Sequence, residues 1–184
     1  VLLPHYVKGR VAREKVFLRS PDHYDRLGIT FFSHRRAVGL TPTRHEAALD
    51  DGKTIRYGKL LWAAGGEARK PTVLGADLPG VLYFRTLEDA DAIRREVERL
   101  AELPEHDRVA AIVGGGFISL EFPPFFTPHR IKTHLIINTP RYWERLLDEE
   151  SSGIIHDVLT EHGVTMHYQE DCTGFVGEES LQGV

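Results

Sequence analysis

The chain has 184 residues, of which 41% are hydrophobic, and it carries a formal net charge of −4 at pH 7. This size and composition predict one large or two small globular domains with a buried core, and the net negative charge argues against a nucleic-acid partner. No apolar run is long enough to cross a membrane, and residues 1–10 lack the pattern of a signal peptide, so we expect no membrane partner.

The cysteine and histidine content limits the chemistry further. A single cysteine, Cys172, excludes a disulfide within the chain and a C-x-x-C redox pair. We expect it to be a buried, inert thiol in a reducing, cytoplasmic setting. The ten histidines are scattered without the spacing of metal ligands, so no metal site is predicted.

The first part of the chain is predicted to be rich in short strands. Residues 1–19 are expected to be irregular and then strand-like at their end. Ser20 and Pro21 predict a short helix that ends at Gly28, because serine caps a helix, proline suits its first position and glycine its end. Asp50-Asp51-Gly52 predicts a hairpin turn. Strands are predicted over residues 29–32, 36–40, 46–49 and 54–57, and a buried strand over residues 60–64.

The second part of the chain alternates helices with strands. A helix is expected over residues 86–100, with acids early and arginines late as the helix dipole favours, and another over residues 148–162, ending at Gly163. Strands are predicted over residues 109–113, 131–137, 164–168 and 172–176. This alternation is typical of parallel βαβ units with right-handed crossovers, so the predicted fold class is α/β with a Rossmann-like, three-layer domain.

The segment VAAIVGGGFISLE, residues 109–121, joins an apolar strand to a glycine-rich turn. Gly114, Gly116 and Ser119 have the G-x-G-x-x-G/A spacing of dinucleotide-binding turns. In such a turn the first glycine permits the sharp bend, the second lets the backbone approach a pyrophosphate, and the third small residue lets helix and strand pack closely. The following helix adds N–H donors to the phosphates, so the segment predicts a dinucleotide site.

Several further segments occur in a characteristic order along the chain. They are Glu14-Lys15-Val16, Tyr24 with Gly28-Ile29, Asp51–Tyr57, Lys59–Gly66, Pro79-Gly80-Val81, Arg85-Thr86 with Asp89-Ala90, and Val113–Ile118. This ordered set covers most of residues 5–176. It resembles the flavoprotein reductases with two dinucleotide-binding domains, in the branch of the ferredoxin/rubredoxin reductases and the apoptosis-inducing-factor-like oxidoreductases.

This resemblance implies a strand-rich, partial FAD-binding domain over residues 1–78 and an NAD(P)H-binding domain over residues 79–184. In such reductases NAD(P)H delivers hydride to flavin N5, and the reduced flavin passes electrons to a ferredoxin- or rubredoxin-like protein or to another acceptor. The expected cofactors are therefore FAD and NAD(P)H. The resemblance leaves undecided whether the protein forms a homodimer. The disulfide-reductase relatives use a cysteine pair, which this chain lacks.

Matching the family motifs residue by residue implies roles for several positions. Lys8 and Glu121 match a lysine and an acid that form an ion pair beside the flavin, where they would stabilise negative charge on the reduced ring. The simpler alternatives are an ordinary surface lysine and a helix-start acid. Ala63, Ala64 and Gly65 match the strand end that passes near FAD, although the family usually has threonine in place of Ala64. The NAD(P)H pyrophosphate turn would comprise Gly114, Gly115, Gly116, Phe117, Ile118 and Ser119.

The chain departs from the family pattern in the second half. Pro123, Pro124 and Pro128 fall where the family has a regular helix, so we expect this helix to be short, kinked or replaced by a loop. Asn138 stands where an Asp or Glu would bind the ribose. Arg141 nearby either meets a 2′-phosphate or is an exposed loop arginine.

These departures leave a second interpretation open. The FAD-phosphate fingerprint and the late Gly-Asp segment of the family have no counterpart in residues 1–184, so we expect this chain alone to bind FAD weakly or not at all. The alternative is a degenerate, non-catalytic piece that keeps the fold as a scaffold or oligomerisation module. Tyr142 and Trp143 are expected to pack in the core rather than beside an adenine.

Overall fold

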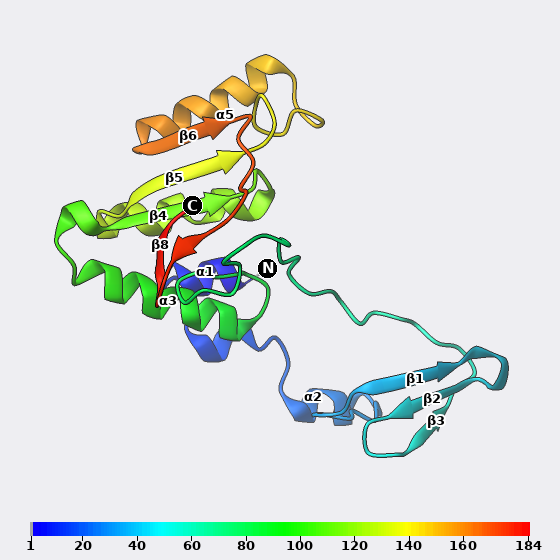
Figure 1. The fold of residues 1–184 in the computed structure, drawn as a ribbon. Helices are drawn as coiled ribbons and strands as arrows, with labels where there is room; N and C mark the ends of the chain where they lie inside the picture. The colour runs from blue at the N-terminus through cyan, green and yellow to red at the C-terminus, as the bar shows by residue number, and fades with distance from the viewer. Residues whose placement is uncertain (1) are drawn as a thin grey trace. The chain divides into compact units, whose positions relative to one another are not determined.

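The computed structural model describes residues 2–184 (Figure 1). It divides into two compact units, which are treated separately below: unit 1 comprises the residues up to Val16 together with Ala68–Val184, and unit 2 comprises Phe17–Glu67. This division describes packing within the chain, and the assignment of residues 1–78 and 79–184 to two cofactor domains stays a prediction. Within the described residues, no helix has the length and apolar character that a membrane span requires.

Unit 2 is built from local elements. The helix α2 (Pro21–Arg26) begins and ends close to its predicted bounds. An antiparallel sheet follows, in the order β1-β2-β3 (Figure 1). Its strands are β1 (Ala37–Thr41), β2 (Glu46–Leu49) and β3 (Thr54–Arg56), with the 3-10 helix η2 (Pro42–Arg44) after β1. The predicted turn at residues 50–52 joins β2 to β3, with Gly52 at φ +82°, a conformation that favours glycine.

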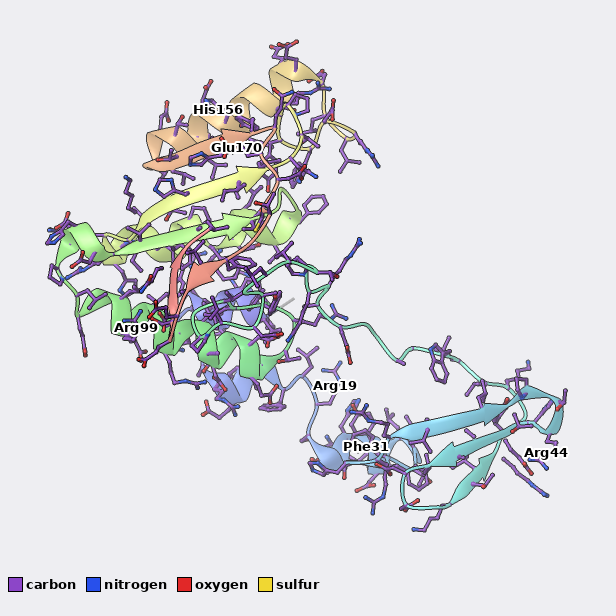
Figure 2. The ribbon with its side chains drawn as sticks, viewed as in Figure 1. Arg19, Phe31, Arg44, Arg99, His156 and Glu170 are labelled. Carbon is purple, nitrogen blue, oxygen red and sulfur yellow. The ribbon has the colours of Figure 1, made fainter. Side chains whose placement is uncertain are left out.

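Three predicted strands of the first part are absent. Residues 29–32 and 60–64 have no strand structure, and the strand-like end of residues 1–19 is instead the 3-10 helix η1 (Arg13–Val16) followed by an irregular segment. Phe31 stacks on Tyr24 with ring centroids 4.5 Å apart (Figure 2). Leu61 is 88% exposed, so the apolar run at residues 60–64 is not buried. An apolar run becomes a strand only when neighbouring strands take its backbone hydrogen bonds, and none of the described strands pairs with residues 60–64.

Unit 1 contains the predicted parallel sheet. Its order is β4-β5-β6, with all neighbours parallel (Figure 1). Its strands are β4 (Val109–Val113), β5 (Lys132–Ile137) and β6 (Val164–Tyr168), and the helix α5 (Glu149–Glu161) connects β5 to β6. The βαβ prediction is therefore confirmed, and with it the α/β class.

The remaining elements of unit 1 surround this sheet. The helix α3 (Leu87–Ala101) begins with a capping box in which Thr86 and Asp89 exchange hydrogen bonds, and Arg99 near its end pairs with Glu96 (Figure 2). The helix α1 (Leu3–Val7) was not predicted. The other elements are η3 (Glu105–Asp107), β7 (Val176–Gly177) and β8 (Leu181–Gly183). The strand predicted at residues 172–176 is therefore wrong except at Val176, and Cys172 is half-buried rather than buried.

The core of unit 1 consists of two clusters of buried side chains. The first joins α1, α3 and the segment after the glycine turn, and comprises Tyr6, Val7, Ala90, Ile93, Val97, Phe122, Phe126 and Ile131. The second joins β5, β6 and α5, and comprises Leu135, Ile137, Tyr142, Leu159 and Val164. Ile112 of β4 packs against both clusters, whereas Val109 and Val113, on the opposite face of the strand, are exposed. The strand that leads into the glycine turn is thus fixed by two cores.

The segment after the glycine turn is broken, as the prolines predict. It consists of the 3-10 helix η4 (Phe117–Glu121), one turn of helix α4 (Pro123–Phe126) and the 3-10 helix η5 (Thr127–His129). Proline lacks the N–H that a regular helix needs and fits only a first turn. Pro123 therefore begins a new short helix and does not continue η4.

Candidate functional site

The glycine turn leaves the carboxyl end of β4 with a conformation that only glycine tolerates well. Gly114 has φ +110°, and its N–H donates to the carbonyl of Ile136 on β5 (2.9 Å). A Cβ atom on Gly115 would lie 3.0 Å from Cγ2 of Ile137, closer than side chains normally pack. The backbone bend thus favours glycine at position 114, and the close packing of the turn on β5 favours it at position 115.

Gly116 is different, because the fold itself does not need a glycine there. Its backbone is extended (φ −85°, ψ 175°), and a Cβ atom would meet nothing within 4 Å. Within residues 2–184, the amide groups of Gly115 and Gly116 donate to no backbone or side-chain acceptor. Open space beside free N–H groups is what a pyrophosphate requires at the second glycine of a dinucleotide turn.

Phe117 and Ile118, the next predicted residues, point outward. Phe117 is 66% exposed and its ring lies 4.2 Å from that of Trp143, measured between centroids. Ile118 is also exposed. Their side chains therefore border the open side of the turn and add little to the core.

Ser119 turns inward instead. It is buried, and its hydroxyl donates to the carbonyl of Gly116 (2.5 Å) and lies 2.6 Å from the hydroxyl of Tyr142. The Tyr142 hydroxyl also donates to the Gly116 carbonyl (2.6 Å). The prediction of Tyr142 in the core is confirmed, but its contact with the glycine turn was not foreseen. A serine in place of the last small residue of the motif was the available signal, because a buried hydroxyl needs a partner.

Lys8 and Glu121 are brought together although 113 positions separate them. Lys8 follows α1 and Glu121 ends η4, and the lysine ammonium forms an ion pair and a hydrogen bond with Glu121 Oε2. The lysine side chain is 12% exposed and the glutamate side chain 40%. Lys8 is thus a largely buried cation with one fixed partner, and the outer part of that partner stays open to solvent.

Arg141 is directed toward its own loop. Its Nη2 donates to the carbonyl of Glu144 (3.1 Å), and its Nε is buried with no partner among the described residues. Asn138 at the end of β5 is exposed. A contact between Arg141 and a 2′-phosphate would therefore need the guanidinium to leave this carbonyl, and that role remains a prediction.

The residues predicted near FAD lie in unit 2. Ala63, Ala64 and Gly65 are exposed and outside any strand, and Gly65 has φ +73°. Their role at the flavin remains a prediction. Over residues 2–184, no group of three or more His, Cys, Asp or Glu side chains has the arrangement of a metal site. Unit 1 offers backbone N–H groups that can bind an anion, and an ion pair between the largely buried Lys8 and the partly exposed Glu121.

Known proteins resemble this chain in sequence along most of its length. A family model described as "Pyridine nucleotide-disulphide oxidoreductase" matches residues 2–184. A 5,5'-dehydrodivanillate O-demethylase ferredoxin reductase subunit of Sphingobium sp. is 33% identical over 159 residues, which are 86% of this chain and 37% of that protein. A putidaredoxin reductase of Pseudomonas putida is 28% identical over 173 residues, which are 92% of this chain and 39% of that protein.

Solved structures give the same result for the fold. A ferredoxin reductase from Rhodopseudomonas palustris matches with a TM-score of 0.85 and 26% identity, over 98% of this chain and 43% of that chain. A covalent complex of putidaredoxin reductase with putidaredoxin matches with a TM-score of 0.84 and 26% identity, over the same shares of the two chains. The chain thus spans less than half the length of these relatives, and the α/β, Rossmann-like fold class is confirmed.

Proposed function

Since the chain belongs to the pyridine nucleotide-disulphide oxidoreductase family, we propose that it is part of a flavoprotein that passes hydride from NAD(P)H to FAD and electrons onward to a redox protein. The observation that carries this proposal is the open side of the glycine turn, where Gly116 has free space and an unpartnered N–H. The reductases of the ferredoxin and putidaredoxin systems that resemble this chain support it.

In this proposal the turn binds the diphosphate of the nicotinamide nucleotide. Backbone N–H groups stabilise an anion without a titratable side chain, so binding does not depend on a proton being gained or lost. The two cores hold β4, and Gly114 bonds to β5, so the turn is rigid before the nucleotide arrives. The nicotinamide supplies hydride and the flavin accepts it, and the role of the chain is to orient both and to exclude water.

Lys8 is proposed to act at the flavin. A lysine ammonium that is largely buried stabilises negative charge nearby more strongly than one in water, because the local dielectric is low. Glu121 fixes its position through their ion pair and leaves the other N–H donors of the ammonium available. Replacing either residue should therefore slow flavin reduction and leave the nucleotide affinity largely unchanged.

The test is the rate of flavin reduction by NADH and NADPH in the full-length protein. Lys8→Met is expected to slow the reaction roughly 100- to 1,000-fold, the size of effect seen when one preorganised donor is removed. Glu121→Gln is expected to slow it by a smaller factor, because the ammonium donor remains. Lys70→Met is the matched control, because Lys70 forms an exposed ion pair with Asp77 in the same unit. Rates equal to the wild type in both Lys8→Met and Glu121→Gln would remove the role assigned to the pair.

The electron acceptor proposed is a small iron–sulfur protein of the ferredoxin or rubredoxin kind. The support is the putidaredoxin bound to the reductase in a structurally similar complex. Reduction of a ferredoxin or rubredoxin by the full-length protein with NADH or NADPH tests it. A cytoplasmic location and a homodimer are further proposals, which cell fractionation and light scattering would check.

The alternative interpretation, a non-catalytic scaffold, has less support. The prolines that motivated it begin after Glu121 and leave the geometry of residues 114–116 intact. The relatives reported above are named as reductases. Calorimetry of this chain with NADH, NADPH and FAD separates the two interpretations, because a scaffold would bind none of them in the micromolar range.

A further inference from the structure

A group of three oxygen atoms, two of them on buried side chains, lies at the inner side of the glycine turn. The carbonyl of Gly116, the hydroxyl of Ser119 and the hydroxyl of Tyr142 lie 2.5–2.6 Å from one another. Tyr142 is fully buried (0% exposed) and Ser119 nearly so. The Ser119 amide also donates to the Gly116 carbonyl (3.1 Å). This carbonyl is therefore held from the interior by three donors.

The orientation of one peptide group follows from these contacts. The carbonyl of Gly116 and the amide of Phe117 belong to the same planar, trans peptide, so they point in opposite directions. The carbonyl points toward buried Tyr142 and Ser119, so the Phe117 N–H points away from them. Gly116 and Phe117 are exposed, and the Phe117 N–H has no backbone acceptor among the described residues.

We propose that Tyr142, acting with Ser119, is a positioning residue that holds the Gly116–Phe117 peptide with its N–H turned toward the diphosphate of the nicotinamide nucleotide. This inference rests on the proposed function, since it names how the same turn is prepared for its ligand. Without these hydroxyls the peptide could rotate and present its carbonyl, which repels a phosphate.

Tyr142 is itself fixed from behind. Its own backbone carbonyl accepts a hydrogen bond from Ser152 Oγ on α5 (2.7 Å), and Ser152 is buried. Burial raises the pKa of the Tyr142 hydroxyl, so this hydroxyl keeps its proton and remains a donor at neutral pH. The helix that connects β5 to β6 thus supports the turn at the end of β4 through one tyrosine.

The two hydroxyl groups have two protons for the three short contacts, so either hydroxyl can donate to the Gly116 carbonyl when the other is absent. In either single variant one hydroxyl remains to hold the Gly116 carbonyl. Removing both leaves only the Ser119 amide. The two substitutions should therefore be non-additive, with the double variant losing more than the product of the single effects.

The test compares Tyr142→Phe, Ser119→Ala and the double variant with Tyr83→Phe. Tyr83 is the matched control, because its hydroxyl also donates to a backbone carbonyl of unit 1, that of Ala76 (3.0 Å), and makes no hydrogen bond to the glycine turn. Calorimetry with NADH and NADPH should give dissociation constants about 3- to 10-fold higher for each single variant, the value of one net hydrogen bond. The double variant should lose more than the product of the two measured single effects, that is, more than about 10- to 100-fold, and Tyr83→Phe should bind like the wild type.

Amide hydrogen exchange of the nucleotide-free chain supplies a second readout. Exchange of the Ser119 amide, which donates to the Gly116 carbonyl, should be faster in Tyr142→Phe than in the wild type and in Tyr83→Phe. Unchanged exchange there, or unchanged nucleotide affinity in Tyr142→Phe and in the double variant, would overturn the inference. A wild-type chain that binds neither nucleotide would contradict the proposed function instead, and the exchange comparison would still decide whether Tyr142 holds the turn.

Discussion

The two compact units of this chain illustrate two ways in which an apolar sequence becomes structure. In unit 1, helices and a parallel sheet close two buried clusters, and Leu135 at the centre of β5 is 0% exposed. In unit 2, hairpins form locally, but Leu49 is the one buried hydrophobic residue among the described side chains. A parallel sheet cannot form without its crossover helix and the core beneath it, whereas a hairpin needs only its turn.

The largest expected difference between the units concerns leucines of equal size. Leu135→Ala should lower the free energy of unfolding of unit 1 by about 2–5 kcal/mol, because it leaves a cavity in a fully buried site. Leu61→Ala should change the stability of unit 2 by less than about 0.5 kcal/mol, because that side chain is 88% exposed.

The two tryptophans allow each unit to be followed separately. Trp62 lies in unit 2 and Trp143 in unit 1, so Trp62→Phe leaves a fluorophore in unit 1 alone and Trp143→Phe leaves one in unit 2. Urea unfolding in these two backgrounds measures both leucine substitutions. A large loss of stability in Leu61→Ala would mean that residues 60–64 are packed, and would contradict the contrast between the two leucines.

A smaller effect is expected at two glycines that share a positive φ. Gly114→Ala should destabilise unit 1 by about 1–3 kcal/mol, because φ +110° is strained for alanine and the bond to Ile136 holds the backbone there. Gly65 has φ +73° in an exposed segment outside any strand, where the backbone can relax. Gly65→Ala should therefore cost clearly less in the same urea experiment. Equal losses would show that residue 65 is held as firmly as the glycine turn.

The smallest expected effect is a pH dependence confined to unit 1. Burial, with smaller contributions from Lys132 and His167, lowers the pKa of His134 below its ordinary value of 6.5. The unfolded chain therefore takes up this proton at a higher pH than the folded chain, so stability falls as the pH drops below about 6.5. His134→Gln should flatten the decline between about pH 7 and pH 5, measured by urea unfolding with Trp143 fluorescence. A variant that declines as steeply as the wild type would exclude His134 as the cause.

Most regular elements could be predicted because their signals are local. The strands at residues 109–113, 46–49 and 164–168 have the predicted bounds, since a turn or a glycine borders each of them: Gly114, Asp50-Asp51-Gly52 and Gly163. The run at residues 60–64 looks equally apolar, yet no described strand pairs with it, and partner strands cannot be read from a local pattern. The helix α1 was missed because proline in a short apolar segment suggests irregular structure as readily as a first helical turn.

The three parts of the candidate site differ in how far the sequence alone predicts them. The glycine spacing predicts the turn, because each glycine meets a separate physical demand of a phosphate site. The contact between Lys8 and Glu121 came from the family resemblance, since nothing local connects positions so far apart. The hydroxyl group of Tyr142 could not be placed from sequence, because its partner is a backbone carbonyl of another loop.

The most direct test of the glycine turn as the nucleotide site is the binding of NADH and NADPH by Gly116→Ala. The fold has room for this methyl group, and its backbone suits any residue, so stability should stay the same or rise slightly. If a diphosphate lies against the turn, the methyl group occupies the space that the ligand needs, and calorimetry should show affinity for NADH and NADPH reduced at least about 10-fold, or 1.4 kcal/mol. Binding equal to that of the wild type would contradict the assignment of this turn as the nucleotide site.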